Sequence, residues 1–223
     1  MSGLFITFEG PDGAGKTTQV NFLCQWLKES GIPFVRAKEP GGTAIGDKVR
    51  QLLLDPSHVE MADKAEILLY AASRAQLIEE VIQPALVDGQ IVICDRYVDA
   101  SLAYQGFGLG YPLRDIRAIN DFGTGGIRPD RTYLLDLPAE EGIDRLQRYR
   151  PEGLDRMEQK TVAFHQRVRQ GFLQLAAEEP ARFHRIDARQ SEDTIFTCIQ
   201  TDLRQSFSLG GKDSEANYCR RAR

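Results

Sequence analysis

The sequence has few of the residues that build metal centres or disulfide frameworks. It holds four cysteines and three histidines among 223 residues, and neither set is clustered or spaced as metal ligands are. It also lacks an apolar run of membrane-spanning length and an N-terminal signal pattern. The formal net charge of −4 argues against general nucleic-acid binding. We therefore expect a cytoplasmic globular protein with no membrane partner and no nucleic-acid partner.

What the chain does have is a phosphate-binding loop close to its N-terminus. Residues 4–9 are apolar and β-branched enough for a buried parallel strand, and the next residues satisfy the pattern G-x-x-x-x-G-K-[ST]. A helical repeat follows, so strand, loop and helix come in the required order. The backbone N–H groups of such a loop and the helix N-terminus bind a polyphosphate. The predicted ATP-binding residues are Gly10, Pro11, Asp12, Gly13, Ala14, Gly15, Lys16, Thr17 and Thr18.

Two residues of this loop have the most specific predicted roles. Lys16 should reach the β- and γ-phosphates, and the hydroxyl of Thr17 should bind Mg²⁺. The alternative is a glycine turn that binds nothing, but such a turn gives the lysine no packing role.

A second apolar strand, residues 91–95, ends in an acid that is followed by a base. A P-loop enzyme needs an acid such as Asp95 to hold its metal through water. Arg96 comes next, and a charged pair at the end of a buried strand costs desolvation free energy unless it has ligands. The alternative is an internal network in which Asp95 and Arg96 pair with each other.

Strands alternate with helices along the whole chain, which predicts an α/β fold with a parallel sheet and right-handed crossovers. We expect five strands, with helices on both faces of the sheet. The expected strands are residues 4–9, 33–37, 91–95, 132–137 and 183–187. The longest expected helix covers residues 62–86. A short helix over residues 101–105 should give way to a loose segment at Gly106, Gly108 and Gly110.

The domain organisation is expected to be simple. Residues 1–207 should form one domain, and the polar, aperiodic residues 208–223 a disordered tail. Within the domain, residues 145–157 are basic and broken by proline and glycine, which is typical of a mobile lid over phosphates. A solvated basic loop is the alternative.

Arginines are frequent near the expected strand ends: Arg50, Arg74, Arg96, Arg148, Arg150 and Arg156. Phosphoryl transfer between two anions needs positive charge on the donor, on the acceptor and on the group in flight. The chain has no Asn-Lys-x-Asp motif for guanine and is short for a transporter ATPase. The pattern therefore favours a kinase with a phosphorylated acceptor.

Six segments resemble the thymidylate kinase family in order and spacing, and the resemblance covers residues 4–205. The segments are residues 9–18, Glu-Pro-Gly-Gly-Thr at 39–43, Ala-Ala-Ser-Arg at 71–74, Asp-Arg-Tyr at 95–97, Ser-Leu-Ala-Tyr-Gln-Gly at 101–106 and Leu-Asp-Arg at 154–156. The resemblance implies a P-loop NTPase fold of the nucleoside monophosphate kinase type and a homodimer packed through helices. It implies phosphorylation of dTMP to dTDP with ATP and Mg²⁺. The alternatives are a P-loop kinase for another nucleoside or nucleoside monophosphate, and a nucleotide-binding module without transfer activity.

The resemblance also implies roles for single residues in the phosphate region. Asp12 would hold the sugar 3′-hydroxyl near Mg²⁺, and Asp95 would assist the metal. Arg50 and Arg96 would bind the acceptor phosphate. The predicted catalytic residues are Lys16, Asp12, Arg96, Arg148 and Arg150.

A second group of residues would bind the acceptor nucleoside. Tyr70 would stack on thymine, for which plain core packing is the alternative, and Arg74 would donate a hydrogen bond to O4. Tyr104 would crowd the 2′ position of a ribose. Ser101 and Gln105 would line the base pocket. The remaining predicted substrate-binding residue is Glu39.

At two positions this sequence differs from other sequences of the family that it resembles. One branch of the family has an arginine at the position of Gly13, so here Arg148 or Arg150 of the lid is expected to neutralise the transferred phosphoryl group. Related bacterial sequences usually have arginine at the position of Lys38, and lysine keeps the charge but loses the bidentate fork. A purely structural role for Lys38 is therefore open.

Overall fold

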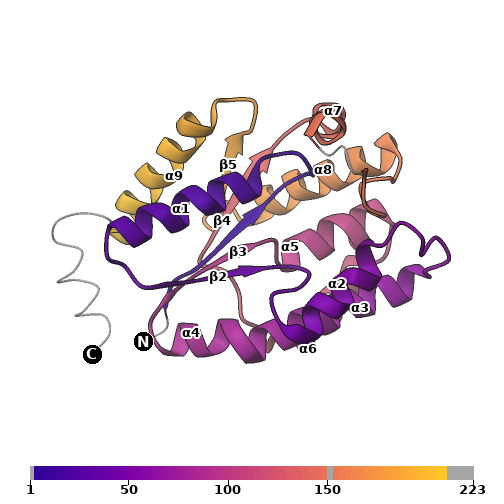
Figure 1. Ribbon diagram of the computed structural model, residues 1–223, viewed down its shortest axis with the longest axis horizontal. Helices are drawn as coiled ribbons and strands as arrows, with labels where there is room; N and C mark the ends of the chain where they lie inside the picture. The colour runs from indigo at the N-terminus through magenta and orange to yellow at the C-terminus, as the bar shows by residue number, and fades with distance from the viewer. Residues whose placement is uncertain (1–2, 150–152, 210–223) are drawn as a thin grey trace.

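The computed structural model describes residues 3–149 and 153–209. One parallel sheet of five strands, in the order β2-β3-β1-β4-β5, runs through the molecule with helices on both faces (Figure 1). The strands are β1 (Phe5–Glu9), β2 (Phe34–Lys38), β3 (Ile91–Asp95), β4 (Arg131–Asp136) and β5 (Phe183–Asp187). The predicted α/β fold with a five-stranded parallel sheet is confirmed.

The helices alternate with these strands, and two short π-helical segments, η1 and η2, continue the α-helices before them. The helical elements are α1 (Lys16–Glu29), α2 (Ala44–Leu54), α3 (Asp63–Leu77), η1 (Ile78–Ile82), α4 (Gln83–Val87), α5 (Val98–Ser101), η2 (Leu102–Gly108), α6 (Leu113–Thr124), α7 (Ala139–Tyr149), α8 (Val162–Glu178) and α9 (Glu192–Phe207).

The two faces of the sheet bury different helices. On one face α1 and α9 pack side by side, with Leu23 and Ile199 fully buried against the strands (Figure 1). On the other face α3, η1 and α4 cover β2 and β3, while α5, η2 and α8 cover β4 and β5. Because both faces are covered, the central strands β1 and β3 are apolar along most of their length, whereas β2 and β5 at the two edges carry charged residues.

The sheet register brings three chemically distinct segments to one edge. Phe8 of β1 and Lys38 of β2 both lie opposite Asp95 of β3, so these strands end at the same level. The P-loop, the Glu39 turn and the Asp95–Arg96 segment therefore meet beyond the carboxyl ends of the strands, where ligands bind in open α/β sheets.

The expected loose segment after residue 105 is wrong, because the helix continues through Gly106 and Gly108. A Cβ atom on Gly106 would lie 2.4 Å from Leu113, and one on Gly108 would lie 2.6 Å from the ring of Phe164. These glycines allow η2 to pack closely against α6 and α8. The expected long helical stretch over residues 62–86 is present as α3, η1 and α4, which follow one another without a break.

The described chain ends just beyond α9. Leu209 is buried in the cluster beneath α1 and α9, and its N–H donates to the carbonyl of Leu203. The rest of the predicted tail, residues 210–223, lies outside the described residues. No helix within the described ranges is long and apolar enough to cross a membrane.

Candidate active site

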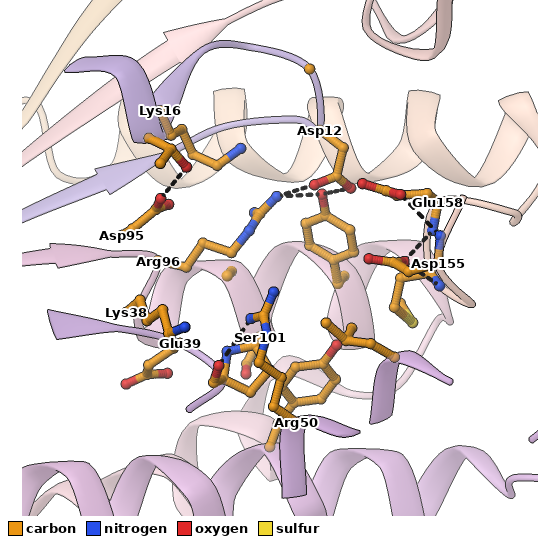
Figure 2. Close-up of a pocket in the computed structure, with 18 of the residues that line it drawn as sticks. Asp12, Lys16, Lys38, Glu39, Arg50, Asp95, Arg96, Ser101, Asp155 and Glu158 are labelled. Carbon is orange, nitrogen blue, oxygen red and sulfur yellow. Dashed lines mark hydrogen bonds and ion pairs between the residues drawn. The ribbon is translucent and has the colours of Figure 1, made fainter. Parts of the chain in front are cut away.

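A cavity of about 520 Å³ opens at the carboxyl edge of β1, β2 and β3 (Figure 2). It brings together residues from the P-loop, the turn after β2, helices α2 and α3, the α5–η2 helix and the lid segment. The predicted site residues that line it are Asp12, Gly13, Gly15, Lys16, Thr17, Thr18, Glu39, Arg50, Tyr70, Arg74, Asp95, Arg96, Ser101, Tyr104 and Gln105. The predicted residues that do not line it are Gly10, Pro11, Ala14 and Arg148.

Lys16 lies inside the P-loop, at the first position of α1. Its Nζ donates to the carbonyl oxygens of Gly10 at 3.0 Å and Pro11 at 2.7 Å. Burial, together with the charge of Arg96, lowers the pKa of Lys16 to about 8. An anion in the loop would offset this burial, since it would give the ammonium a counter-charge in place of two carbonyl dipoles.

The P-loop touches α7 backbone to backbone at Gly13. A Cβ atom there would lie 2.4 Å from the carbonyl oxygen of Gly142, and the backbone φ of 77° is one that side chains rarely adopt. Arg145 of the same helix donates to the carbonyls of Gly13 and Ala188. An arginine at position 13 is therefore excluded in this arrangement.

The two predicted metal ligands lie next to each other. The hydroxyl of Thr17 donates to Oδ2 of Asp95 at 2.6 Å, which joins α1 to the end of β3. A hydroxyl and a carboxylate oxygen suit Mg²⁺, which in nucleotide enzymes takes one or two carboxylates together with water and phosphate oxygens. Among the described residues no group of three or more His, Cys, Asp or Glu side chains converges on a metal position. The protein part of such a site would therefore be small.

Asp12, Arg96 and Tyr104 form one hydrogen-bonded group across the cavity (Figure 2). The guanidinium of Arg96 pairs with Oδ1 of Asp12, and the hydroxyl of Tyr104 donates to Oδ2 at 2.6 Å. Burial alone would raise the pKa of Asp12, but Arg96 and then Lys16 outweigh it and hold the pKa at about 2. Arg96 is thus paired with Asp12, so the alternative of an Asp95–Arg96 pair is not what the structure has.

The backbone of Arg96 is left-handed, with a φ of 72°, which is uncommon for a residue with a side chain. Three hydrogen bonds hold this turn. The N–H of Arg96 donates to the carbonyl of Phe8 at 3.0 Å, and that of Tyr97 donates to Oε1 of Glu9 at 2.7 Å. The thiol of Cys94 donates to the Arg96 carbonyl at 3.0 Å. Strained residues that are held this firmly cluster at functional sites, because the fold must maintain them.

Tyr70 of α3 lines the cavity together with Arg74 and Ser101. Tyr70 is half-buried there, and burial raises its pKa, so its ring presents a flat, neutral face. Tyr70 lines the cavity, unlike a residue that serves only core packing.

Arg74 lies in this pocket but is bound to the protein. It is 2% exposed, and Nε donates to Glu39 at 2.6 Å. The other guanidinium nitrogens donate to Ser101, Asn120 and the carbonyl of Tyr97, with a further contact to Glu39. Each of its donors has a protein partner, so the predicted bond to O4 of thymine would have to replace one of these.

The structure describes the two ends of the lid segment, residues 145–149 and 153–157. Arg148 forms an ion pair with Asp144 at 2.5 Å and its side chain is 69% exposed. Arg150 lies outside the described residues. Arg156, which the sequence placed among the phosphate-binding arginines, is instead buried against Glu66 at 2.7 Å. It also donates to the carbonyl of Leu53 at 2.8 Å, so it anchors the end of the lid to α2 and α3.

Several lining residues were not singled out from the sequence. Asp155 and Glu158 face the cavity from the lid side in Figure 2, opposite Lys38 and Arg50. Asp155 belongs to the Leu-Asp-Arg segment that resembles the family, whereas no sequence motif pointed to Glu158. Arg36, which the sequence did not mark either, lines the cavity from β2 together with Lys38, whose role the sequence left open. Lys38 therefore faces the cavity.

Comparisons with known proteins identify the family to which this chain is similar. The family model described as thymidylate kinase matches residues 8–199. The thymidylate kinase of Exiguobacterium sibiricum is 52% identical over 203 residues, which are 91% of this chain and 95% of that protein. The thymidylate kinase of Roseiflexus castenholzii is 46% identical over 203 residues, which are 86% and 89% of the two chains. The crystal structure of thymidylate kinase from Ehrlichia chaffeensis matches with a TM-score of 0.73 at 33% identity, covering 91% of this chain and 99% of that one.

Proposed function

This chain belongs to the thymidylate kinase family, and we propose that it transfers the γ-phosphoryl group of ATP to dTMP, giving ADP and dTDP. The observation that carries the proposal is the continuity of one cavity from the P-loop to the Tyr70 pocket, with Arg96 between them. A phosphoryl donor and a phosphorylated acceptor can meet there end to end.

The reaction needs positioning and charge rather than a strong base. An oxygen of the acceptor phosphate attacks the γ-phosphorus of ATP, and the bond from that phosphorus to the β-phosphate oxygen breaks. Lys16 would neutralise the donor phosphates, and Arg50 and Arg96 the acceptor phosphate. The Nε of Arg96 makes no hydrogen bond to a described residue, so the guanidinium can donate to phosphate oxygens while Nη2 stays paired with Asp12.

Mg²⁺ is part of the proposal, with the Thr17 hydroxyl and, through water, Asp95 as its protein partners. When bound, it would neutralise charge on the β- and γ-phosphates. The Thr17–Asp95 hydrogen bond of 2.6 Å supports this assignment, because it keeps both oxygens at one position beside the P-loop.

The lid arginines are proposed to supply the remaining positive charge. The contact between Gly13 and Gly142 leaves no room for a P-loop arginine, which supports a source elsewhere. Arg148 and Arg150 are the candidates. Arg148 would have to leave its partner Asp144 and turn toward the donor.

We propose that the enzyme is a homodimer that packs through α3 and α6. These helices contact each other, and each carries a large exposed apolar side chain, Leu68 at 57% and Phe122 at 94% exposure. Sedimentation velocity of wild type and of Phe122→Lys tests the proposal. A dimer that the substitution converts to monomer supports it, and a wild-type monomer contradicts it. The cytoplasmic location expected from the sequence stays a prediction.

The activity is tested by a coupled assay with ATP and Mg²⁺ and a panel of monophosphates. ADP release should be fastest with dTMP and slower with dAMP, dCMP and dGMP, and Lys16→Ala should abolish it. Equal rates across the panel would favour a kinase for another monophosphate instead. A crystal soaked with ADP and dTMP should carry the pyrimidine ring on Tyr70.

A further inference from the structure

The amide of Gln105 is held in one orientation at the wall of the base pocket. The side chain is 2% exposed and lines the cavity from η2. Its Nε2 donates to Oε1 of Glu66 at 2.9 Å. Its Oε1 accepts no hydrogen bond from any described residue and is not among the buried atoms that lack a partner, so it is open to the cavity.

Glu66 determines this orientation. Its carboxylate is fully buried on α3, and the second oxygen accepts from Arg156 at 2.7 Å. An ionised carboxylate only accepts hydrogen bonds, and an amide offers donors on nitrogen and acceptors on oxygen. The amide nitrogen must therefore face Glu66, which leaves the amide oxygen for the ligand. The carboxylate partner thus decides which end of the Gln105 amide is nitrogen and which is oxygen.

Ser101 beside Gln105 keeps its hydroxyl hydrogen available as a donor. Arg74 only donates, and its Nη1 donates to Oγ of Ser101 at 3.0 Å. The hydroxyl hydrogen of Ser101 therefore points away from Arg74. Ser101 and Gln105 are four residues apart on one continuous helix, and both line the cavity. The wall presents a donor next to an acceptor.

We propose that Glu66 is a positioning residue that sets the base preference of this site, by holding the Gln105 oxygen as an acceptor for N3–H of a pyrimidine. Thymine and uracil have a donor at N3 and an acceptor at O4, which match this wall. Cytosine has an acceptor at N3, so it would place a lone pair against the Gln105 oxygen. A site built with a fixed hydrogen-bond polarity rejects such a ligand strongly, since buried polar groups are left unpaired.

The inference rests on the proposed function, and Glu66→Gln tests it. A glutamine at position 66 can present either an oxygen or an amino group, so Gln105 can turn its own amide. The kcat/KM ratio for dTMP over dCMP, measured with both substrates in one reaction with ATP, should fall at least about tenfold. The ratio for dTMP over dUMP should stay within about twofold, because uracil has the same N3–H and O4. Competition ratios do not depend on how much of the variant is folded.

A double-mutant cycle separates orientation from general damage. In a Gln105→Met background, where no amide remains, Glu66→Gln should not change the dTMP to dCMP ratio further. Glu80→Gln is the matched control, since Glu80 accepts from the Gln76 amide at 2.9 Å on the exposed side of the helix. It should leave both ratios unchanged.

Three outcomes would overturn the inference. The first is a Glu66→Gln enzyme with the wild-type dTMP to dCMP ratio, while the wild type itself prefers dTMP. The second is an equal fall in both ratios, which would mark a general structural defect. The third is a wild type that does not phosphorylate dTMP, which would overturn the proposed function as well.

Discussion

Arg96 and Asp12 form an ion pair across the cavity although they are 84 positions apart in the chain. The pair lies in the part of the cavity where the donor and acceptor phosphates would meet. The pair fixes the guanidinium of Arg96 in the cavity, while its Nε makes no hydrogen bond to a described residue and stays available for a phosphate oxygen. Arg96 is consequently the residue at which activity and stability can be separated most clearly.

Replacing Arg96 by alanine and by glycine should abolish transfer alike, with a kcat loss on the order of 10³-fold. The two variants should differ in stability. Glycine adopts the left-handed φ of 72° at no steric cost, so Arg96→Gly should be about 0.5–1 kcal/mol more stable than Arg96→Ala. Urea denaturation and the coupled assay measure both quantities. Equal stability of the two variants would show that the turn carries no strain.

Filling the contact between the P-loop and α7 should damage ATP binding. Gly13→Ala places a Cβ atom 2.4 Å from the Gly142 carbonyl, whereas Gly110→Ala meets nothing within 4 Å at a similar positive φ. Both variants carry backbone strain of about 1–2 kcal/mol. Only Gly13→Ala should also raise the KM for ATP, because the loop must move. A KM for ATP that rises equally in both variants would contradict this account.

Removing the hydroxyl of Tyr104 should separate its two contributions. Tyr104→Phe keeps the ring contacts with Phe164 and Phe172 but loses the bond to Asp12, so stability should hold while kcat falls about tenfold. Tyr104→Ala should also lose about 3–5 kcal/mol of stability through the cavity that it leaves. It should lose the preference for deoxyribonucleotide over ribonucleotide, measured with dTMP and its ribose analogue. A Tyr104→Ala enzyme with the wild-type preference would assign that role elsewhere.

Asp136 should govern part of the acid stability. Burial raises its pKa, but hydrogen bonds from Arg169 at 2.7 Å and Arg185 at 2.6 Å prevail and lower it. The folded state then binds fewer protons than the unfolded one, whose pKa is about 3.9, so the stabilisation is present above that pH and is lost as pH falls through the folded pKa. Asp136→Asn should lower the urea midpoint at pH 7 and flatten its acid dependence. Asp121→Asn on α6 is the exposed control, and an identical acid limb in wild type and Asp136→Asn would refute the assignment.

The sequence predicted those parts of the site that depend on contiguous patterns. The P-loop, the acid at the end of β3 and the helix bearing Tyr70 and Arg74 all lie where apolar periodicity and strand ends put them. Thr17 and Asp95 meet because β1 and β3 are neighbours in the sheet, an order that the sequence did not predict.

The remainder depends on contacts that no local pattern encodes. Arg156 was interpreted as a phosphate ligand because basic residues in a broken segment resemble a lid, but its partner Glu66 lies 90 positions away and has no motif. Gly106 and Gly108 were interpreted as loosening the chain, since composition alone does not distinguish flexibility from close packing. Only the facing side chains of Leu113 and Phe164 decide between these readings.

β2 is an edge strand of the sheet. Within residues 3–149 and 153–209 no strand pairs with the outer side of β2, and an unpaired side can pair with strands of other molecules. Arg36 and Lys38, both exposed there, give that edge two like charges that repel an incoming chain. We expect these two cations to disfavour edge-to-edge pairing, so a variant that neutralises both should lose solubility before it loses its fold.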